Sequence, residues 1–310
     1  MAKTTFAQDD SRPGHTGVMP SKNNLRGISA MLLAVPSFAF MDAGLKLLSQ
    51  HYPAMQVAAL RALASLPLVY AYVAWRGAIP GLWRVRWRWH LLRGVLGIAM
   101  LSLFAFGLRH LPMAEAYSIS FIAPILITAL SVPVLGEKVD AGRWLAVFVG
   151  LAGVLVVLRP SAAGMLGLGG LAILGAAFCY AVSAIVVRLA NKTDSSESLV
   201  FWLMTFVAVG AGSMAAPHWT EVRLDDGWIL LGVAVFGFFG QLTITEAFRH
   251  GQASVIAPFE YTALAWALAL DWLLWRATPD RITLIGAAII IASGVYLVRR
   301  ERVHVESEHP

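Results

Sequence analysis

Apolar residues along this chain gather into long runs that short polar stretches separate. A helix of about 20 residues crosses the roughly 30 Å hydrocarbon core of a bilayer. Ten runs have about that length, near 27–48, 54–75, 91–109, 112–135, 142–158, 168–188, 198–216, 227–248, 253–274 and 282–298. The pattern predicts an all-α membrane protein with ten transmembrane helices. An even number of crossings places both termini on the same side of the membrane.

The composition leads to the same fold class. Hydrophobic residues make up 58% of the chain and charged residues 14%, compared with about 45–50% and about 25% in soluble domains. A soluble core cannot hide such an excess, so much of the apolar surface must face lipid. Residues 1–24 and 299–310 are polar or charged, and we expect two disordered cytosolic tails there. The first lacks the pattern of a cleaved signal peptide.

Lysine and arginine residues orient the predicted helices, because loops on the cytoplasmic side of membrane proteins carry an excess of them. If the N-terminus is cytoplasmic, most of these residues fall in inner loops and tails. The outer loops then hold only Arg109, Arg159, Arg223, Arg276 and Arg281. We therefore expect a multi-pass protein of the bacterial inner membrane. The same distribution explains the net charge of +6 without a nucleic-acid partner.

The sequence contains no recognisable metal or catalytic motif. Cys179 is the only cysteine, the eight histidines have no ligand spacing, and neither a Gly-rich phosphate loop nor a nucleophile elbow is present. We therefore expect no metal, no cofactor and no enzymatic activity. Direct use of ATP would require a separate subunit.

A short internal repeat divides the chain. The stretch that begins L-R-H at Leu108 and reaches A-P at Pro124 resembles the stretch that begins F-R-H at Phe248 and reaches A-P at Pro258. We therefore predict two five-helix repeats, at residues 25–158 and 168–298. Because five is odd, the second repeat is inverted relative to the first. Inverted repeats are typical of secondary transporters, which bind substrate between the halves near the membrane midplane.

Several short motifs occur in a recognisable order. They are Arg61, Leu111-Pro112 with Ala123-Pro124, Leu135-Gly136-Glu137, and the small residues Gly150 and Gly153. With them the chain resembles the drug/metabolite transporter superfamily, in particular its ten-helix EamA-type branch. The second half departs from the family pattern, with Trp275-Arg276 where many relatives repeat a Gly-Glu pair. We interpret the charged turn at Glu137 as a gate or an anchor.

A narrower resemblance concerns the stretches around Met41-Asp42 and Pro258-Phe259-Glu260, which are similar to members for S-adenosylmethionine or riboflavin uptake. The resemblance implies a small amphipathic substrate, such as an amino acid, a nucleoside-like compound or a vitamin-like compound. A shared fold does not determine the ligand. Exporters and importers also share this architecture.

Charged residues within the predicted helices are the first site candidates, because charge inside a bilayer is costly. Asp42 and Lys46 lie one turn apart on the first helix, and Arg61 lies at a similar depth on the second. The three side chains could bind a charged substrate group or a proton. Alternatively, an Asp42–Arg61 or Asp42–Lys46 pair could simply hold two helices together.

Glu260 has no cation nearby in the ninth predicted helix, so we expect a buried carboxyl group that could carry a coupling proton. Asp271 shares its helix face, and we interpret Asp271 as a residue that reaches water near the outer surface. Further polar or aromatic candidates for the cavity lining are Tyr117, Ser120, Pro124, Tyr180, Gln241, Tyr261 and Trp266. Each of these could instead serve in packing between helices.

Two classes of function remain after these observations. The first is a secondary transporter that works as a monomer by alternating access, through exchange, facilitated diffusion or proton coupling. The second is a membrane-embedded enzyme or receptor. The predicted outer loops are too short to form a receptor domain, and no catalytic arrangement is found at membrane depth. The sequence therefore favours the transporter hypothesis.

Overall fold

The computed structural model describes residues 21–160, 167–191 and 193–308, and all regular structure within these ranges is helical. Ten helical segments there are long and apolar enough to cross a membrane. They span Asn23–Leu48, Ala54–Trp75, Trp87–Leu108, Glu115–Leu135, Ala141–Leu158, Leu168–Ala190, Ser196–His218, Leu224–His250, Ala253–Leu274 and Arg281–Glu301. The prediction of ten apolar helices is confirmed, with boundaries that differ by a few residues.

Among the described residues, the first part of the chain contains the helices α1 (Ser21–Leu48), α2 (Ala54–Trp75), α3 (Trp87–Leu108), α4 (Met113–Ser120), α5 (Ala123–Leu135) and α6 (Ala141–Leu158). The remaining α-helices are α8 (Leu168–Ala190), α9 (Ser196–Ala215), α10 (Gly227–His250), α11 (Ala253–Ile256), α12 (Thr262–Trp275) and α13 (Arg281–Glu308). Short 3-10 segments are η1 (Ile79–Leu82), η2 (Ala216–His218), η3 (Leu224–Asp226) and η4 (Ala257–Tyr261).

The fourth and ninth spans are not continuous α-helices. Phe121 and Ile122 separate α4 from α5, and Pro124 lies in the first turn of α5. The ninth span runs as α11, then η4 with Pro258 near its start, then α12. Proline has no N–H group, so a carbonyl of the preceding turn loses its helical partner at each break. A break therefore occurs at Pro124, and the second half has a corresponding one at Pro258.

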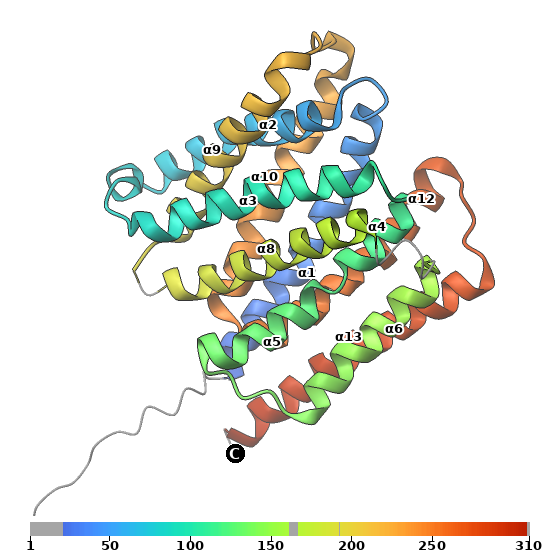
Figure 1. The fold of residues 1–310 in the computed structure, drawn as a ribbon. Helices are drawn as coiled ribbons and strands as arrows, with labels where there is room; N and C mark the ends of the chain where they lie inside the picture. The colour runs from blue at the N-terminus through green and yellow to red at the C-terminus, as the bar shows by residue number, and fades with distance from the viewer. Residues whose placement is uncertain (1–20, 161–166, 192, 309–310) are drawn as a thin grey trace, which may run out of the picture.

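The helices pack in pairs that are distant in sequence (Figure 1). The most extensive contacts join α1 to α10, α3 to α8, α2 to α9, and α6 to α13. Backbones approach closely where small residues meet: a Cβ atom at Gly153 would lie 3.0 Å from the carbonyl oxygen of Gly286. These interactions hold the two parts of the chain against each other along their whole length.

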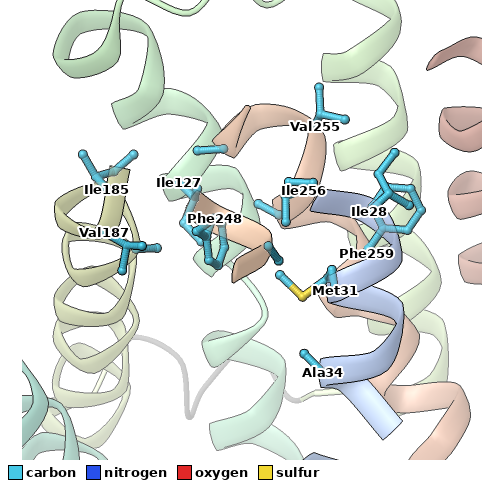
Figure 2. Packing of buried hydrophobic residues seen from close by; sticks show 14 of the residues in the cluster. Ile28, Met31, Ala34, Ile127, Ile185, Val187, Phe248, Val255, Ile256 and Phe259 are labelled. Carbon is cyan, nitrogen blue, oxygen red and sulfur yellow. The ribbon is translucent and has the colours of Figure 1, made fainter. Parts of the chain in front are cut away.

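A buried apolar cluster occupies the junction of several helices (Figure 2). Met31 of α1, Ile127 of α5, Ile185 of α8 and Phe248 of α10 contribute to it, together with Phe259 of η4. The cluster therefore positions the broken ninth span against four other helices. Many other large apolar side chains lie on the outside of the bundle, as a lipid-facing surface requires.

The first and last helices extend beyond their predicted boundaries. α1 begins at Ser21, and α13 continues to Glu308. Asn24 and Glu301 are both buried, and the Asn24 amide donates a hydrogen bond to the Glu301 carboxylate at 3.1 Å. This contact joins the two ends of the described chain. Residues 1–20 of the predicted N-terminal tail lie outside the described residues, as do residues 309–310.

Candidate functional site

Glu260 lies in η4, at the break of the ninth span. The Tyr180 hydroxyl of α8 donates a hydrogen bond to Oε1 of Glu260 at 2.8 Å. No cation lies within ion-pair distance of Glu260 among the described residues. The predicted absence of a local cation therefore holds, and tertiary packing supplies a tyrosine as the partner of the carboxyl group. A carboxyl group with one neutral donor can still bind a cation or a proton.

Asp42 of α1 and Arg61 of α2 interact electrostatically inside the bundle. Among the described residues, no nitrogen of Arg61 lies within 4.0 Å of a carboxylate oxygen of Asp42. The two charges therefore do not form a direct ion pair. The Arg61 guanidinium instead lies 5.7 Å from the ring centre of Phe38. The Asp42 side chain is exposed, and it lies in the C-terminal third of α1. Both charges are thus available to a third group.

Lys46 forms its ion pair with Asp271 of α12, with Nζ 2.8 Å from Oδ1. The long lysine side chain therefore reaches across to α12. The Asp271 side chain is partly exposed, as predicted, and in addition it pairs with Lys46. Both side chains remain about half exposed, at 53% and 42%.

Tyr117 of α4 is 39% exposed and lies within electrostatic range of Asp42. Ser120 donates its hydroxyl hydrogen to the carbonyl of Ala116 in the same helix at 2.9 Å. This local bond supports the packing interpretation for Ser120. Pro124 is buried and contributes the break in the span. Of this group, Tyr117 is the side chain that faces the charged residues.

The remaining candidates occupy different environments. Tyr261 is 1% exposed and its ring packs against Gly150, while its hydroxyl is buried without a hydrogen-bond partner in the described part of the chain. Gln241 of α10 is 7% exposed, and its amide forms no hydrogen bond with the described residues. Trp266 of α12 is 41% exposed. Tyr261 is therefore mainly a packing residue, whereas the amide of Gln241 remains available.

Glu137 makes the most extensive polar contacts near one end of the bundle. Its buried carboxylate accepts hydrogen bonds from the backbone N–H groups of Ala253 and Ser254 at 2.8 and 2.9 Å, and from the Ser254 hydroxyl at 2.7 Å. The Arg188 guanidinium lies 3.7 Å away. The contact ties the end of α5 to the start of α11, which gives Glu137 the geometry of an anchor.

A second buried network lies at the same end, and its partners were not identified from sequence. Arg143 donates hydrogen bonds to Gln252 at 2.8 Å and to Glu301 at 2.9 Å. The N–H of Gln252 donates to the Asn24 side chain at 2.9 Å. Only the polarity of these residues, close to helix ends, could have indicated such a network.

Arg93 lies within α3 and is 3% exposed. Its guanidinium donates a hydrogen bond to the carbonyl of Leu199 at 3.0 Å. A carbonyl partner satisfies part of the charge without an anion.

One pocket lies near the end of the bundle opposite to Glu137. Its volume is about 380 Å³, and Asp271, Arg159, Asp280 and Thr283 line it together with apolar residues of α6 and α12. The described residues contain no group of three or more histidine, cysteine or acidic side chains that could hold a metal ion. The candidate chemistry is thus that of isolated charges and hydrogen-bonding groups.

The family profile described as the EamA-like transporter family matches this chain twice, at residues 25–159 and 167–300. Similar proteins include a pseudopaline exporter of Pseudomonas aeruginosa, 25% identical over 89% of this chain and 97% of the relative. A riboflavin transporter of Vibrio cholerae is 27% identical over 89% of this chain and 94% of the relative. An S-adenosylmethionine uptake transporter of Rickettsia prowazekii is 25% identical over 93% and 97%.

A solved crystal structure has a similar fold. Its TM-score with this chain is 0.77 at 20% sequence identity, and the match covers 92% of this chain and all of the other. At this identity the likeness concerns the fold alone.

Proposed function

This chain belongs to the EamA-like transporter family, and we propose that it moves a small amphipathic metabolite across the bacterial inner membrane by alternating access. It is a multi-pass membrane transporter, as its ten apolar helices and its relatives indicate. The family and the relatives are named for transport and not for an enzymatic reaction.

The helix contacts support two inverted repeats. Several of the largest contacts recur when the first and second halves exchange roles: α1–α10 corresponds to α8–α3, and α5–α8 corresponds to α12–α1. Side-chain contacts follow the same rule. The approach of Gly153 to the Gly286 carbonyl corresponds to the hydrogen bond from Ser293 to the Ala146 carbonyl at 2.8 Å. Five crossings per half support an inverted second copy, and the distribution of lysine and arginine supports a cytoplasmic position of both termini.

The two halves hold their charges at different positions. Counting from the starts of α2 at Ala54 and α9 at Ser196, Asp42 and Arg61 of the first half correspond to Ala184 and Leu203 of the second. The fold itself therefore does not require a charged pair at these positions, because the matching helices form without one. A charge that the fold does not need is best explained by a bound substrate.

The hydrogen bond between Tyr180 and Glu260 carries the proposal, because it joins α8 to the break in the ninth span. Secondary transporters bind substrates and coupling ions at such breaks near the midplane. Glu260 can bind an ammonium group or a coupling proton, Arg61 a carboxylate, and Tyr117 an aromatic or apolar part. These groups suit a zwitterionic or mixed-charge metabolite, and the relatives suggest amino-acid-like, riboflavin-like or S-adenosylmethionine-like compounds.

Thermal stabilisation of the detergent-purified protein tests the substrate class. A ligand at 100 times its dissociation constant stabilises the folded state by about 2.7 kcal/mol. We expect an upward shift of the melting temperature with at least one of S-adenosylmethionine, riboflavin, pseudopaline and the amino acids. A shift with none of them, together with no exchange of any in proteoliposomes, would overturn the proposed class.

Glu260→Gln tests the coupling role with little change of shape, because the glutamine oxygen can still accept the Tyr180 hydrogen bond. We expect the variant to lose uphill accumulation driven by a proton gradient and to keep part of its substrate exchange. Glu221→Gln, at an exposed position outside the spans, is the matched control and should accumulate substrate normally. Full accumulation by Glu260→Gln would remove Glu260 from the coupling mechanism.

A further inference from the structure

The repeat relation makes it possible to compare the two ends of the bundle residue by residue. Asp140 and Asp280 both accept the backbone N–H three residues later, at the starts of α6 and α13. Glu137 and Ala277 each lie three residues before these aspartates, so they occupy equivalent positions. The first half therefore has a carboxylate at this position, and the second half has none. The two ends of the molecule are therefore closed by different chemistry.

At the end that holds the start of α1, the hydrogen bonds of Glu137 to Ala253 and Ser254 form what we call the Glu137 clasp. The clasp joins the broken span of the first half to that of the second. Glu137 and Arg188 are 4% and 8% exposed at their side chains, so water does not compete for this contact. Charge-assisted hydrogen bonds in such surroundings are the stronger ones.

The network around Arg143 closes the same end in parallel. Arg143 connects α6 to Gln252 at the start of α11 and to Glu301 of α13. Asn24 adds α1 through its bonds with Gln252 and Glu301. Four helices thus meet in a sealed polar layer.

At the opposite end, the described residues place an exposed ion pair at the position that matches Arg188. Counting from the starts of α2 and α9, Lys46 corresponds to Arg188. Lys46 contacts Asp271, and both side chains are about half exposed, at 53% and 42%. The pocket of about 380 Å³ opens beside Asp271. Exposed ion pairs are worth little, because water and salt screen them.

We propose that Glu137 is the gate residue that holds the N-terminal side closed, and that Ala277 leaves the opposite side without an equivalent clasp. The resting transporter is therefore open toward the side opposite to its termini, which is the periplasm in the orientation proposed above. This inference rests on the proposed function, because a gate exists only in a protein that has a transport path. Because Ala277 lacks a carboxylate, the opposite side is held closed less strongly than the N-terminal side. The protein without substrate therefore occupies the state that is open on the opposite side.

Distances between pairs of spin labels test the gate in the detergent-purified full chain. The natural Cys179 is first replaced by alanine. Labels at Lys138 and Thr193 then report on the N-terminal side, and labels at Gln50 and Thr278 report on the opposite side. All four positions are exposed. Without substrate we expect one narrow distance distribution on the N-terminal side and a longer, broader one on the opposite side.

Two variants act in opposite directions. Glu137→Gln should add a longer component to the N-terminal distribution, because the charge that holds Ala253 and Ser254 is lost. Ala277→Glu should add a shorter component on the opposite side, because the new carboxylate can accept the first N–H groups of α4, which have no helical acceptor. Glu221→Gln is the control and should change neither distribution.

The clasp is refuted if the wild-type N-terminal distribution is broad, or if both variants leave the distributions unchanged. If Glu137→Gln does not elute as a single species on size exclusion, Ala277→Glu decides alone. All distances are measured without substrate. Failure to find a transported compound would therefore count against the proposed function, whereas unchanged distances in a transporting protein would count against the gate alone.

Discussion

Two ion pairs that join α6 to α13 differ in burial, and we expect burial, not the N–O distance, to determine how much each contributes to the free energy of unfolding. Arg143 contacts Glu301 at 2.9 Å, and the two side chains are 11% and 5% exposed. Arg159 contacts Asp280 at the shorter distance of 2.6 Å, but these side chains are 46% and 52% exposed. The perturbation is Arg143→Leu, and Arg159→Leu is its matched control.

Removing one partner of a buried pair costs about 3–5 kcal/mol, because it leaves an uncompensated charge. The Arg143 Nε–H is itself buried without a hydrogen-bond partner in the described part of the chain, 3.9 Å from Asp140. In addition, Glu301 retains its bond from Asn24. We therefore place the loss at the lower end, about 3 kcal/mol. The exposed Arg159 pair should contribute about 0–1 kcal/mol.

Each kcal/mol corresponds to roughly 2–4 °C in the melting temperature of a domain of 150–250 residues. Arg143→Leu should thus lower the melting temperature by about 6–12 °C, and Arg159→Leu by at most about 4 °C. The assay is tryptophan fluorescence of the detergent-purified proteins at one fixed scan rate, because membrane proteins often unfold irreversibly.

A double variant separates the charge effect from lost packing. Arg143→Leu with Glu301→Leu should recover part of the stability, because a buried charge pair can be replaced by apolar side chains at little cost. Equal shifts for the two single arginine variants would refute the reasoning from burial. No recovery in the double variant would refute the reasoning from an uncompensated carboxylate.

Two more predictions concern α6, α13 and their connection. Gly153→Leu should destabilise the protein by about 1–3 kcal/mol by forcing α6 away from Gly286, whereas Gly212→Ala, with open space around it, should be neutral or slightly stabilising in the same melting assay. Equal effects would contradict close packing at Gly153. The hydrogen bond from Arg159 holds the pKa of Asp280 well below its usual range, so the melting difference between wild type and Asp280→Asn should stay constant from pH 7 to about pH 5 and shrink below about pH 4. A difference that grows as the pH falls would contradict this sign.

The breaks in the fourth and ninth spans are structural features that local sequence explains. Pro124 predicts a kink, and the structure ends α4 two residues before α5 begins. Pro258 carries the same signal, and η4 forms there. Both breaks follow from a missing N–H group, which is a property of the residue itself.

The partners of the site residues could not be predicted in the same way. Lys46 lies one turn from Asp42, yet it pairs with Asp271, which is far away in the sequence. Tyr180 and Glu260 were both candidates, but nothing in the order of residues indicated that one donates to the other. Long polar side chains reach several neighbours, so local spacing leaves the choice open.

The sequence by itself determined the ten apolar helices and the presence of a repeat, because hydropathy acts locally along the chain. Only the tertiary structure decided which charges are paired and which remain available. It buried Glu137 and Arg143 among several helices at one end, and it left Lys46 and Asp271 half exposed at the other. The physical reason is that burial and partner choice depend on contacts between distant helices, which no local pattern encodes.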